Sequence, residues 1–159
     1  MGAADANRIA ARFDWGKDPG GTSSAPRFTR VRRHRGILTS AWITFFRSGQ
    51  GPVADEVERL IQADRAWLTG VVLAELLRGT RTVGEKTELD ALLSVVPYAE
   101  TERADWERAG EFLRTLRTRG LTVPLSDAVI AAVAERRGLA VLALDRHFDE
   151  LPARRWTAG

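Results

Sequence analysis

Residues 121–145 constrain the fold of this chain more than any other part of the sequence. Apolar residues recur there at helical spacing after a proline and a serine, and Gly138 ends that run. Residues 139–144 are then an uninterrupted apolar run that stops at Asp145. A helix that leads directly into a buried strand is half of an α/β unit. The stretch therefore predicts a parallel sheet covered by helices.

Upstream of this stretch, short apolar runs alternate with amphipathic segments. Strands are predicted at 36–39, 66–69, 95–98 and, near the end of the chain, 153–157; helices are predicted at 40–47, 52–63, 71–79, 85–95 and 105–119. The inward stripe predicted for the last of these helices is Trp106, Ala109, Phe112, Leu113 and Leu116. Alternating strands and helices indicate the α/β class, in a three-layer α/β/α arrangement with a mostly parallel central sheet.

Length and composition limit the classes of protein. A chain of 159 residues is long enough for one domain with a real core. It contains no cysteine, which excludes disulfides and thiolate metal sites and fits a reducing, cytoplasmic setting. No apolar run approaches the roughly 18 residues that a membrane span needs, so no membrane association is expected.

The positive charge is concentrated at the N-terminus. Residues 1–35 hold eight basic and three acidic residues, a net charge of +5, whereas residues 36–159 hold 16 basic and 18 acidic residues, a net charge of −2. We interpret 1–35 as a basic, disordered arm and 36–159 as the folded domain. The five arginines at 27–35 could contact phosphates, or the arm could be a solvated extension or a stretch translated from a wrong start.

Three acids stand out against apolar surroundings. Asp145 directly follows a buried strand, where ligands of parallel sheets collect. Asp127 opens a helix, and Glu75 is the one charged residue between Val71 and Leu77. Each has a structural alternative: Asp127 could be favoured by the helix dipole beside a Ser126 cap, Asp145 could cap residues 146–151, and Glu75 could pair with Arg78.

Four strings, taken together and in this order, resemble the PIN domain and specifically toxins of the VapC type from bacterial toxin–antitoxin pairs. They are ILTSAWITFFR at 37–47, LTGVVLAELLRG at 68–79, LTVPLSDAVIAAVA at 121–134 and VLALDRHF at 141–148. The resemblance implies a compact α/β/α domain with an endoribonuclease activity that depends on Mg²⁺ or Mn²⁺ and leaves a 5′-phosphate and a 3′-hydroxyl. It also implies an RNA substrate, a small antitoxin partner and a homodimer.

Carried over to this chain, the resemblance makes Glu75, Asp127 and Asp145 the catalytic carboxylates and metal ligands. Clustered carboxylates repel each other unless a cation neutralises them, and hard divalent cations prefer oxygen ligands. Thr39 and Asp149 are outer candidates: Thr39 could contact a metal-bound water, and Asp149 could be an outer ligand or an ordinary surface acid.

The chain departs from the family pattern at its first strand. The family has an aspartate there, within the pattern hydrophobic-hydrophobic-Asp-Thr/Ser-Ser. Without a gap Leu38 occupies the aspartate position, and with a two-residue gap before Thr39 the acid is absent. A leucine removes one negative charge from the expected metal cluster. Weak metal binding and low nuclease activity are the expected consequences, and a catalytically inactive PIN-like module that binds an antitoxin or RNA is the alternative function.

Basic residues near the expected site are candidates for holding RNA phosphates, although arginines at helix ends are also ordinary. They are Arg47, Arg78, Arg81 and Arg146. The two histidines, His34 in the basic arm and His147 after Asp145, do not favour a histidine metal site. A surface position on the last short helix is predicted for His147.

Overall fold

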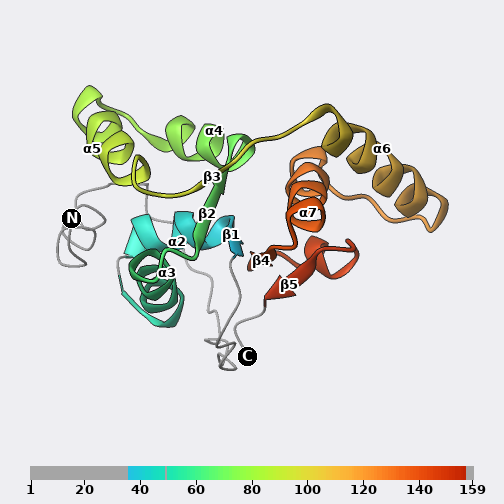
Figure 1. Ribbon diagram of the computed structural model, residues 1–159, viewed down its shortest axis with the longest axis horizontal. Helices are drawn as coiled ribbons and strands as arrows, with labels where there is room; N and C mark the ends of the chain where they lie inside the picture. The colour runs from blue at the N-terminus through green and yellow to red at the C-terminus, as the bar shows by residue number, and fades with distance from the viewer. Residues whose placement is uncertain (1–35, 49, 157–159) are drawn as a thin grey trace.

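A five-stranded, entirely parallel sheet forms the centre of the molecule (Figure 1). The computed structural model describes residues 36–48 and 50–156, except for the side chains of residues 38, 47, 48 and 156. The strands are β1 (Gly36–Leu38), β2 (Ala66–Thr69), β3 (Tyr98–Ala99), β4 (Ala140–Leu142) and β5 (Arg154–Trp156), and their order across the sheet is β3-β2-β1-β4-β5. The predicted class and parallel sheet are confirmed. The predicted arm at 1–35 lies outside the described residues.

Helices connect and cover the strands. They are α2 (Ser40–Ser48), α3 (Pro52–Gln62), α4 (Gly70–Gly79), α5 (Val83–Leu93), α6 (Arg103–Thr118), α7 (Leu125–Arg137) and the 3-10 turn η1 (Arg146–Asp149). Figure 1 shows α2 to α5 gathered around the β2–β3 half of the sheet and α6 and α7 on the β4–β5 half. This arrangement is the expected α/β/α fold. None of the described helices combines the length and the apolar content that crossing a bilayer requires.

The strand order reverses at the centre of the sheet, and we call the region beyond the carboxyl ends of β1 and β4 the crevice. From β1 the chain moves outward through β2 to β3, then crosses back through α6 and α7 to place β4 on the other side of β1. In open parallel sheets, ligands bind beyond the carboxyl ends of the strands where the strand order reverses in this way. Here that point lies between β1 and β4, whose last residues, Leu38 and Leu142, are register partners. The segments that follow these two strands therefore line the crevice.

The core explains why these helices form where they do. Helix α2 places Trp42, Phe45 and Phe46, all fully buried, in one aromatic cluster. Helix α7 is buried on all sides from Ala128 to Ala134, and such a helix must lie inside the fold. Its C-terminus is set by Gly138, which adopts the left-handed conformation with φ 64° that glycine reaches more easily than other residues. The chain can then turn at once into β4.

The third strand differs from the prediction. The sequence predicts a strand at 95–98, whereas β3 is Tyr98–Ala99 and Val95 is 56% exposed. Proline has no N–H to offer a neighbouring strand, and Pro97 contributes only its carbonyl, which accepts a hydrogen bond from the Leu68 N–H at 2.9 Å. Regular pairing therefore begins only after the proline.

The predicted stripe of helix α6 is wrong at one position. Trp106 is 50% exposed, and the neighbouring Asp105 is buried instead, with 1% of its surface exposed. Arg136 of α7 donates to both Asp105 carboxylate oxygens, at 2.7 and 2.8 Å, and the Glu102 N–H donates to Asp105 at 2.8 Å. Burial alone raises the pKa of Asp105, but these hydrogen bonds lower it overall. A charged pair thus ties α6 to α7, which hydrophobic periodicity cannot predict.

Replacing Asp105 with asparagine is expected to lower the free energy of unfolding at pH 7 by about 2–3 kcal/mol, because a buried charged hydrogen-bond network loses one partner. A carboxyl whose folded pKa is depressed contributes stability above its unfolded pKa and loses it as pH falls through the folded pKa. The contribution is therefore present above the ordinary value of 3.8 and is lost below it.

Urea unfolding at pH 7 and at pH 3 measures this contribution for Asp105→Asn. The matched control is Glu107→Gln, which removes a surface ion pair with Arg103 and is expected to change stability by less than about 1 kcal/mol. An equal loss for Asp105→Asn at both pH values would contradict the assigned role of the charge.

Candidate metal centre

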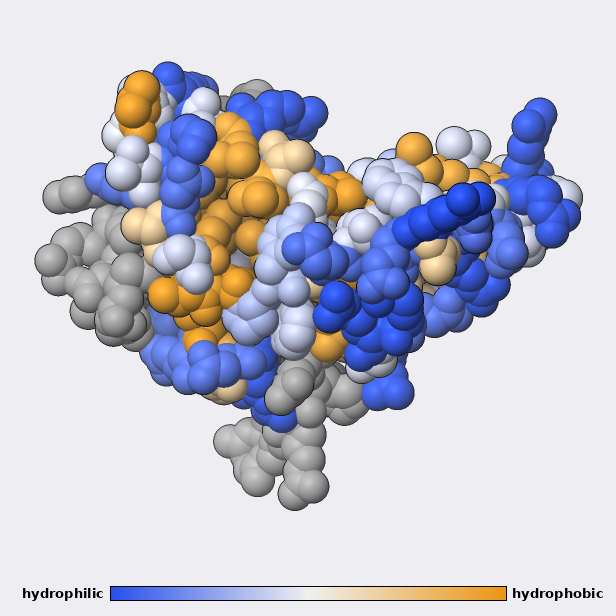
Figure 2. Space-filling view, turned by 45° about the horizontal axis from the view of Figure 1, so that its top comes forward, coloured by the Kyte–Doolittle hydropathy of each residue, from blue (hydrophilic) through white to orange (hydrophobic). Residues whose placement is uncertain are grey.

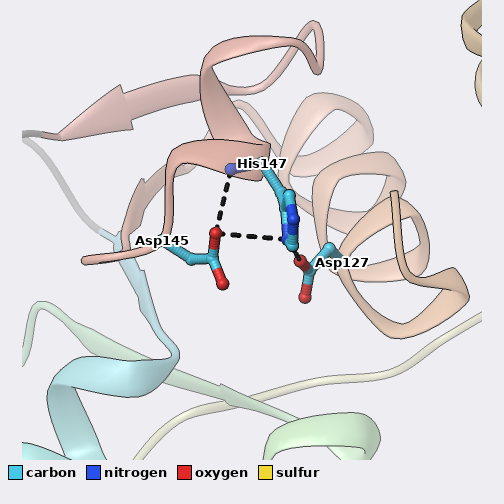
Figure 3. Close-up of side chains that lie close together, drawn as sticks. All are labelled: Asp127, Asp145 and His147. Carbon is cyan, nitrogen blue, oxygen red and sulfur yellow. Dashed lines mark hydrogen bonds and ion pairs between the residues drawn. The ribbon is translucent and has the colours of Figure 1, made fainter. Parts of the chain in front are cut away.

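Two of the predicted acids meet in the crevice between β1 and β4, together with a histidine (Figure 3). Asp127 lies in the first turn of α7, Asp145 follows β4 and caps η1, and His147 lies within η1. Potential ligand atoms of the three side chains all lie within 4.8 Å of one another. Residues separated by a whole helix and strand therefore converge on one point, as the positions of Asp127 and Asp145 in sequence predict.

The imidazole of His147 lies between the two carboxylates. Its Nδ1 is 3.2 Å from Asp127 Oδ2 and 3.1 Å from Asp145 Oδ1. The His147 backbone N–H also donates to Asp145 Oδ1, at 3.0 Å. Asp145 therefore caps the η1 turn, which is the structural role predicted as the alternative to metal binding, and its side chain also faces His147.

Burial makes the negative charge of Asp127 costly. Only 16% of its side chain is exposed, and this desolvation raises the pKa of the carboxyl. A hydrogen bond with His147 lowers the pKa and the charge of Asp145 raises it, with an upward shift as the net result. Ser126 is not the predicted helix cap, because it lies inside α7 and Pro124 occupies the cap position. Its hydroxyl lies 3.5 Å from Asp127 Oδ1.

Glu75 faces the same electrostatic environment from α4. Burial and then the charge of Asp127 raise the pKa of Glu75, whereas the charge of Arg78 lowers it. Glu75 does not belong to the three-residue contact, and among the described residues it forms no ion pair with Arg78. The charges of Glu75 and Asp127 therefore affect each other. That Glu75 is a metal ligand stays a prediction.

The donor set suits a divalent cation. Two carboxylates and an imidazole within 4.8 Å offer oxygen and nitrogen ligands together. Burial, and after it the charge of a neighbouring carboxylate, raises the pKa of Asp127 and of Glu75, so their ionised forms are costly here and a cation would relieve that cost. The residues present therefore fit the metal that the resemblance implies.

The two outer candidates have partners of their own. Thr39 is 6% exposed, and its hydroxyl donates to the Leu142 carbonyl at 3.3 Å, at the end of β4. Asp149 forms an ion pair with Arg155 of β5. This pairing favours the surface-acid alternative for Asp149, whereas Thr39 lies beside the crevice, where β1 ends.

The structure describes three of the four candidate phosphate-binding side chains. Arg78 and Arg146 are exposed, and Arg78 is close enough to Glu75 for its charge to lower the pKa of that carboxyl. Arg81 is also exposed, beyond the end of α4. The side chain of Arg47 lies outside the description. Contacts of these arginines with RNA stay predictions.

His147 is the functional candidate that sequence patterns did not single out. The predicted surface position is correct only in part, because 43% of its side chain is exposed while its ring contacts both acids. Its place two residues after Asp145, inside a turn that Asp145 caps, is a signal that could have identified it. A cap of this kind at position i accepts a hydrogen bond from the backbone N–H of residue i+2 and so keeps that residue close to it.

Comparison with known proteins identifies the family. Residues 39–154 match the PIN domain family. The match begins at the residue that follows β1, so Leu38, which an alignment without a gap would place at the family's first aspartate position, lies outside it. A VapC ribonuclease of Mycobacterium bovis and the ribonuclease VapC11 of Mycobacterium tuberculosis are each 33% identical over 117 residues, which cover 71% of this chain and 87% of each relative.

Solved structures agree on the fold. In the crystal structure of VapBC2 from Rickettsia felis bound to a promoter DNA fragment, one chain superimposes on 76% of this chain and 95% of its own length, with a TM-score of 0.65 and 19% identity. At that identity the likeness concerns the fold alone. Together with the sequence match over 39–154, it settles the assignment. This chain belongs to the PIN-domain family and is a homologue of VapC ribonucleases.

Proposed function

We propose that this protein is a VapC-like toxin, an endoribonuclease that cleaves RNA phosphodiesters with a divalent metal ion. The observation that carries the proposal is the convergence of Asp127 and Asp145 in the crevice of a PIN fold. The 33% identity to VapC ribonucleases supports RNA as the substrate class. We propose that the protein acts in the cytoplasm, where its RNA substrate would be found.

In this mechanism Glu75, Asp127 and Asp145 hold the ion, Mg²⁺ or Mn²⁺. When bound, the ion lowers the pKa of a water molecule and offsets charge on the phosphoryl oxygens. The protein contributes position and charge: Asp127 is carried by the first turn of α7, Asp145 is held by the hydrogen bond that caps η1, and the exposed Arg78 and Arg146 attract the phosphates. Without a cation, the acids would repel the RNA backbone.

A small antitoxin and a second copy of the chain are the partners that we propose. Solved relatives include VapBC complexes with DNA. Figure 2 shows apolar side chains gathered in a broad band on one face of the molecule. Large apolar side chains are exposed in the described part of the chain, with Val83 of α5 at 83% and Leu125 of α7 at 54%. Extensive exposed apolar surface marks sites of protein association.

The position of Leu38 favours a second candidate function. β1 ends in leucine beside Leu142 of β4, where the family has an acid, so the crevice receives no carboxylate from its central strand. A catalytically inactive PIN-like module that still binds an antitoxin or RNA is consistent with that loss.

RNA cleavage by the purified chain tests the proposal. Labelled RNA is incubated with protein and Mg²⁺ or Mn²⁺, and products are compared with a parallel reaction in EDTA. Metal-dependent fragments that end in a 5′-phosphate support the nuclease. Cleavage that persists in EDTA contradicts the metal mechanism, and RNA binding without cleavage in either ion supports the inactive module.

A further inference from the structure

The backbone that carries His147 is anchored on both sides of this residue. Its backbone N–H is fixed by the Asp145 cap, and the next residue, Phe148, is buried with 2% of its surface exposed. The ring therefore extends from a short turn that is anchored on both sides. Figure 3 shows the imidazole projecting toward the carboxylates of Asp127 and Asp145. Ligands presented on an anchored backbone lose little freedom when an ion binds.

The side of the crevice formed by β1 offers little to a cation. After Leu38, whose backbone pairs with Leu142, the next polar group is the Thr39 hydroxyl, which already donates to the Leu142 carbonyl. The carboxylate ligands available to a cation therefore come from Asp127 of α7 and from Asp145 after β4. Glu75 of α4 adds a negative charge that acts on Asp127. Among the histidine, aspartate and glutamate side chains that the structure describes, His147 completes the group whose potential ligand atoms lie within 4.8 Å of one another with Asp127 and Asp145.

We propose that His147 is itself a metal ligand through an imidazole nitrogen, and that it shifts the preference of this site from Mg²⁺ toward Mn²⁺. The inference rests on the proposed metal-dependent function and concerns which side chain binds the ion and which ion is bound. Mg²⁺ strongly prefers oxygen ligands, whereas Mn²⁺ shares its preference for carboxylates but, as a first-row transition ion, accepts an imidazole nitrogen more readily than Mg²⁺ does. One imidazole among two carboxylates therefore favours Mn²⁺.

Mn²⁺ binding to the full-length protein without RNA tests the ligand directly. Electron spin echo modulation of bound Mn²⁺ detects a coordinated imidazole nitrogen independently of catalysis. We expect that nitrogen signal in the wild-type protein and in His34→Gln, and its loss in His147→Gln. His34→Gln is the matched control because it removes the other histidine of the chain. Absence of the nitrogen signal from the wild-type protein, or its persistence in His147→Gln, would overturn the proposal.

Ion preference provides the second measurement. Competition of Mg²⁺ against bound Mn²⁺ gives the ratio of the two affinities, and His147→Gln is expected to lower the preference for Mn²⁺ by about tenfold. His147→Asp supplies an oxygen ligand in place of nitrogen and should move the preference further toward Mg²⁺. An unchanged ratio in both folded variants would contradict the assigned role. The wild-type nitrogen signal decides the matter if either variant does not fold.

These results separate the inference from the function on which it rests. Metal-dependent RNA cleavage without a nitrogen signal would refute the role of His147 and leave the nuclease in place. A nitrogen signal without any RNA cleavage would support His147 as a ligand and refute the nuclease. Failure of the wild-type protein to bind Mn²⁺ would refute the inference.

Discussion

Replacing Leu38 with aspartate is expected to increase metal affinity and RNA cleavage by about 100-fold. The last residue of β1 is the register partner of Leu142, three residues before Asp145, so a carboxylate there joins the crevice at the centre of the sheet. One added charge near a bound ion in a partly buried site contributes on the order of 3 kcal/mol, which corresponds to about a hundredfold change in affinity.

Isothermal titration with Mn²⁺ and Mg²⁺, followed by RNA cleavage at a metal concentration below saturation, measures both effects of Leu38→Asp. Leu38→Asn is the matched control, since it introduces a side chain of the same shape without the charge. An equal gain in both variants would show that removal of leucine, rather than the added carboxylate, is responsible. No gain in Leu38→Asp would mean that the end of β1 does not face the metal site.

Replacing Asp127 with asparagine is expected to lower RNA cleavage by about 100- to 1000-fold, because the site loses a charged group that holds the ion. The comparison is made in the wild-type protein and in Leu38→Asp, so that a weakly active parent does not hide the effect. Single-turnover cleavage rates at saturating metal give the result. If the substitution lowered the cleavage rate in neither protein, Asp127 would have no role in the mechanism.

The same substitution has an opposite expected effect on stability. The folded pKa of Asp127 is raised, mainly by burial. A group of this kind contributes stability below its unfolded pKa, and that contribution is lost as pH rises through the folded pKa. At pH 7 the charged Asp127 carboxylate therefore lowers the stability of the folded protein, and the neutral asparagine side chain removes that unfavourable charge. Thermal unfolding in EDTA should show Asp127→Asn at least as stable as its parent, so lost cleavage cannot be attributed to unfolding.

Much of the fold can be predicted from local patterns because those patterns report local physics. Apolar spacing identifies α7 and β4, and Gly138 marks their junction since few other residues adopt its backbone angles. The prediction fails where a partner far away in sequence decides whether a residue is buried or exposed. Asp105 is buried because Arg136, which lies 31 residues away in sequence, pairs with it, and Trp106 is consequently exposed.

The candidate site divides in the same way. An acid after a buried strand and an acid in the first turn of a helix can be recognised from sequence, because parallel strands bring such positions to one edge of the sheet. Asp127 and Asp145 do meet there. The place of His147 depends instead on how the η1 turn closes around the Asp145 cap, and the coupling of Glu75 to Asp127 depends on how α4 packs near α7.

By itself, the amino-acid sequence determined the α/β class, the order of the elements, two acids that share a crevice and the absence of an acid at the end of the first strand. Only the tertiary structure decided that a histidine lies between those acids and that Asp149 pairs with Arg155 instead. Hydrophobic periodicity reports which face of an element is buried. It carries no information on which polar side chains, far apart in the chain, neutralise one another when the elements pack.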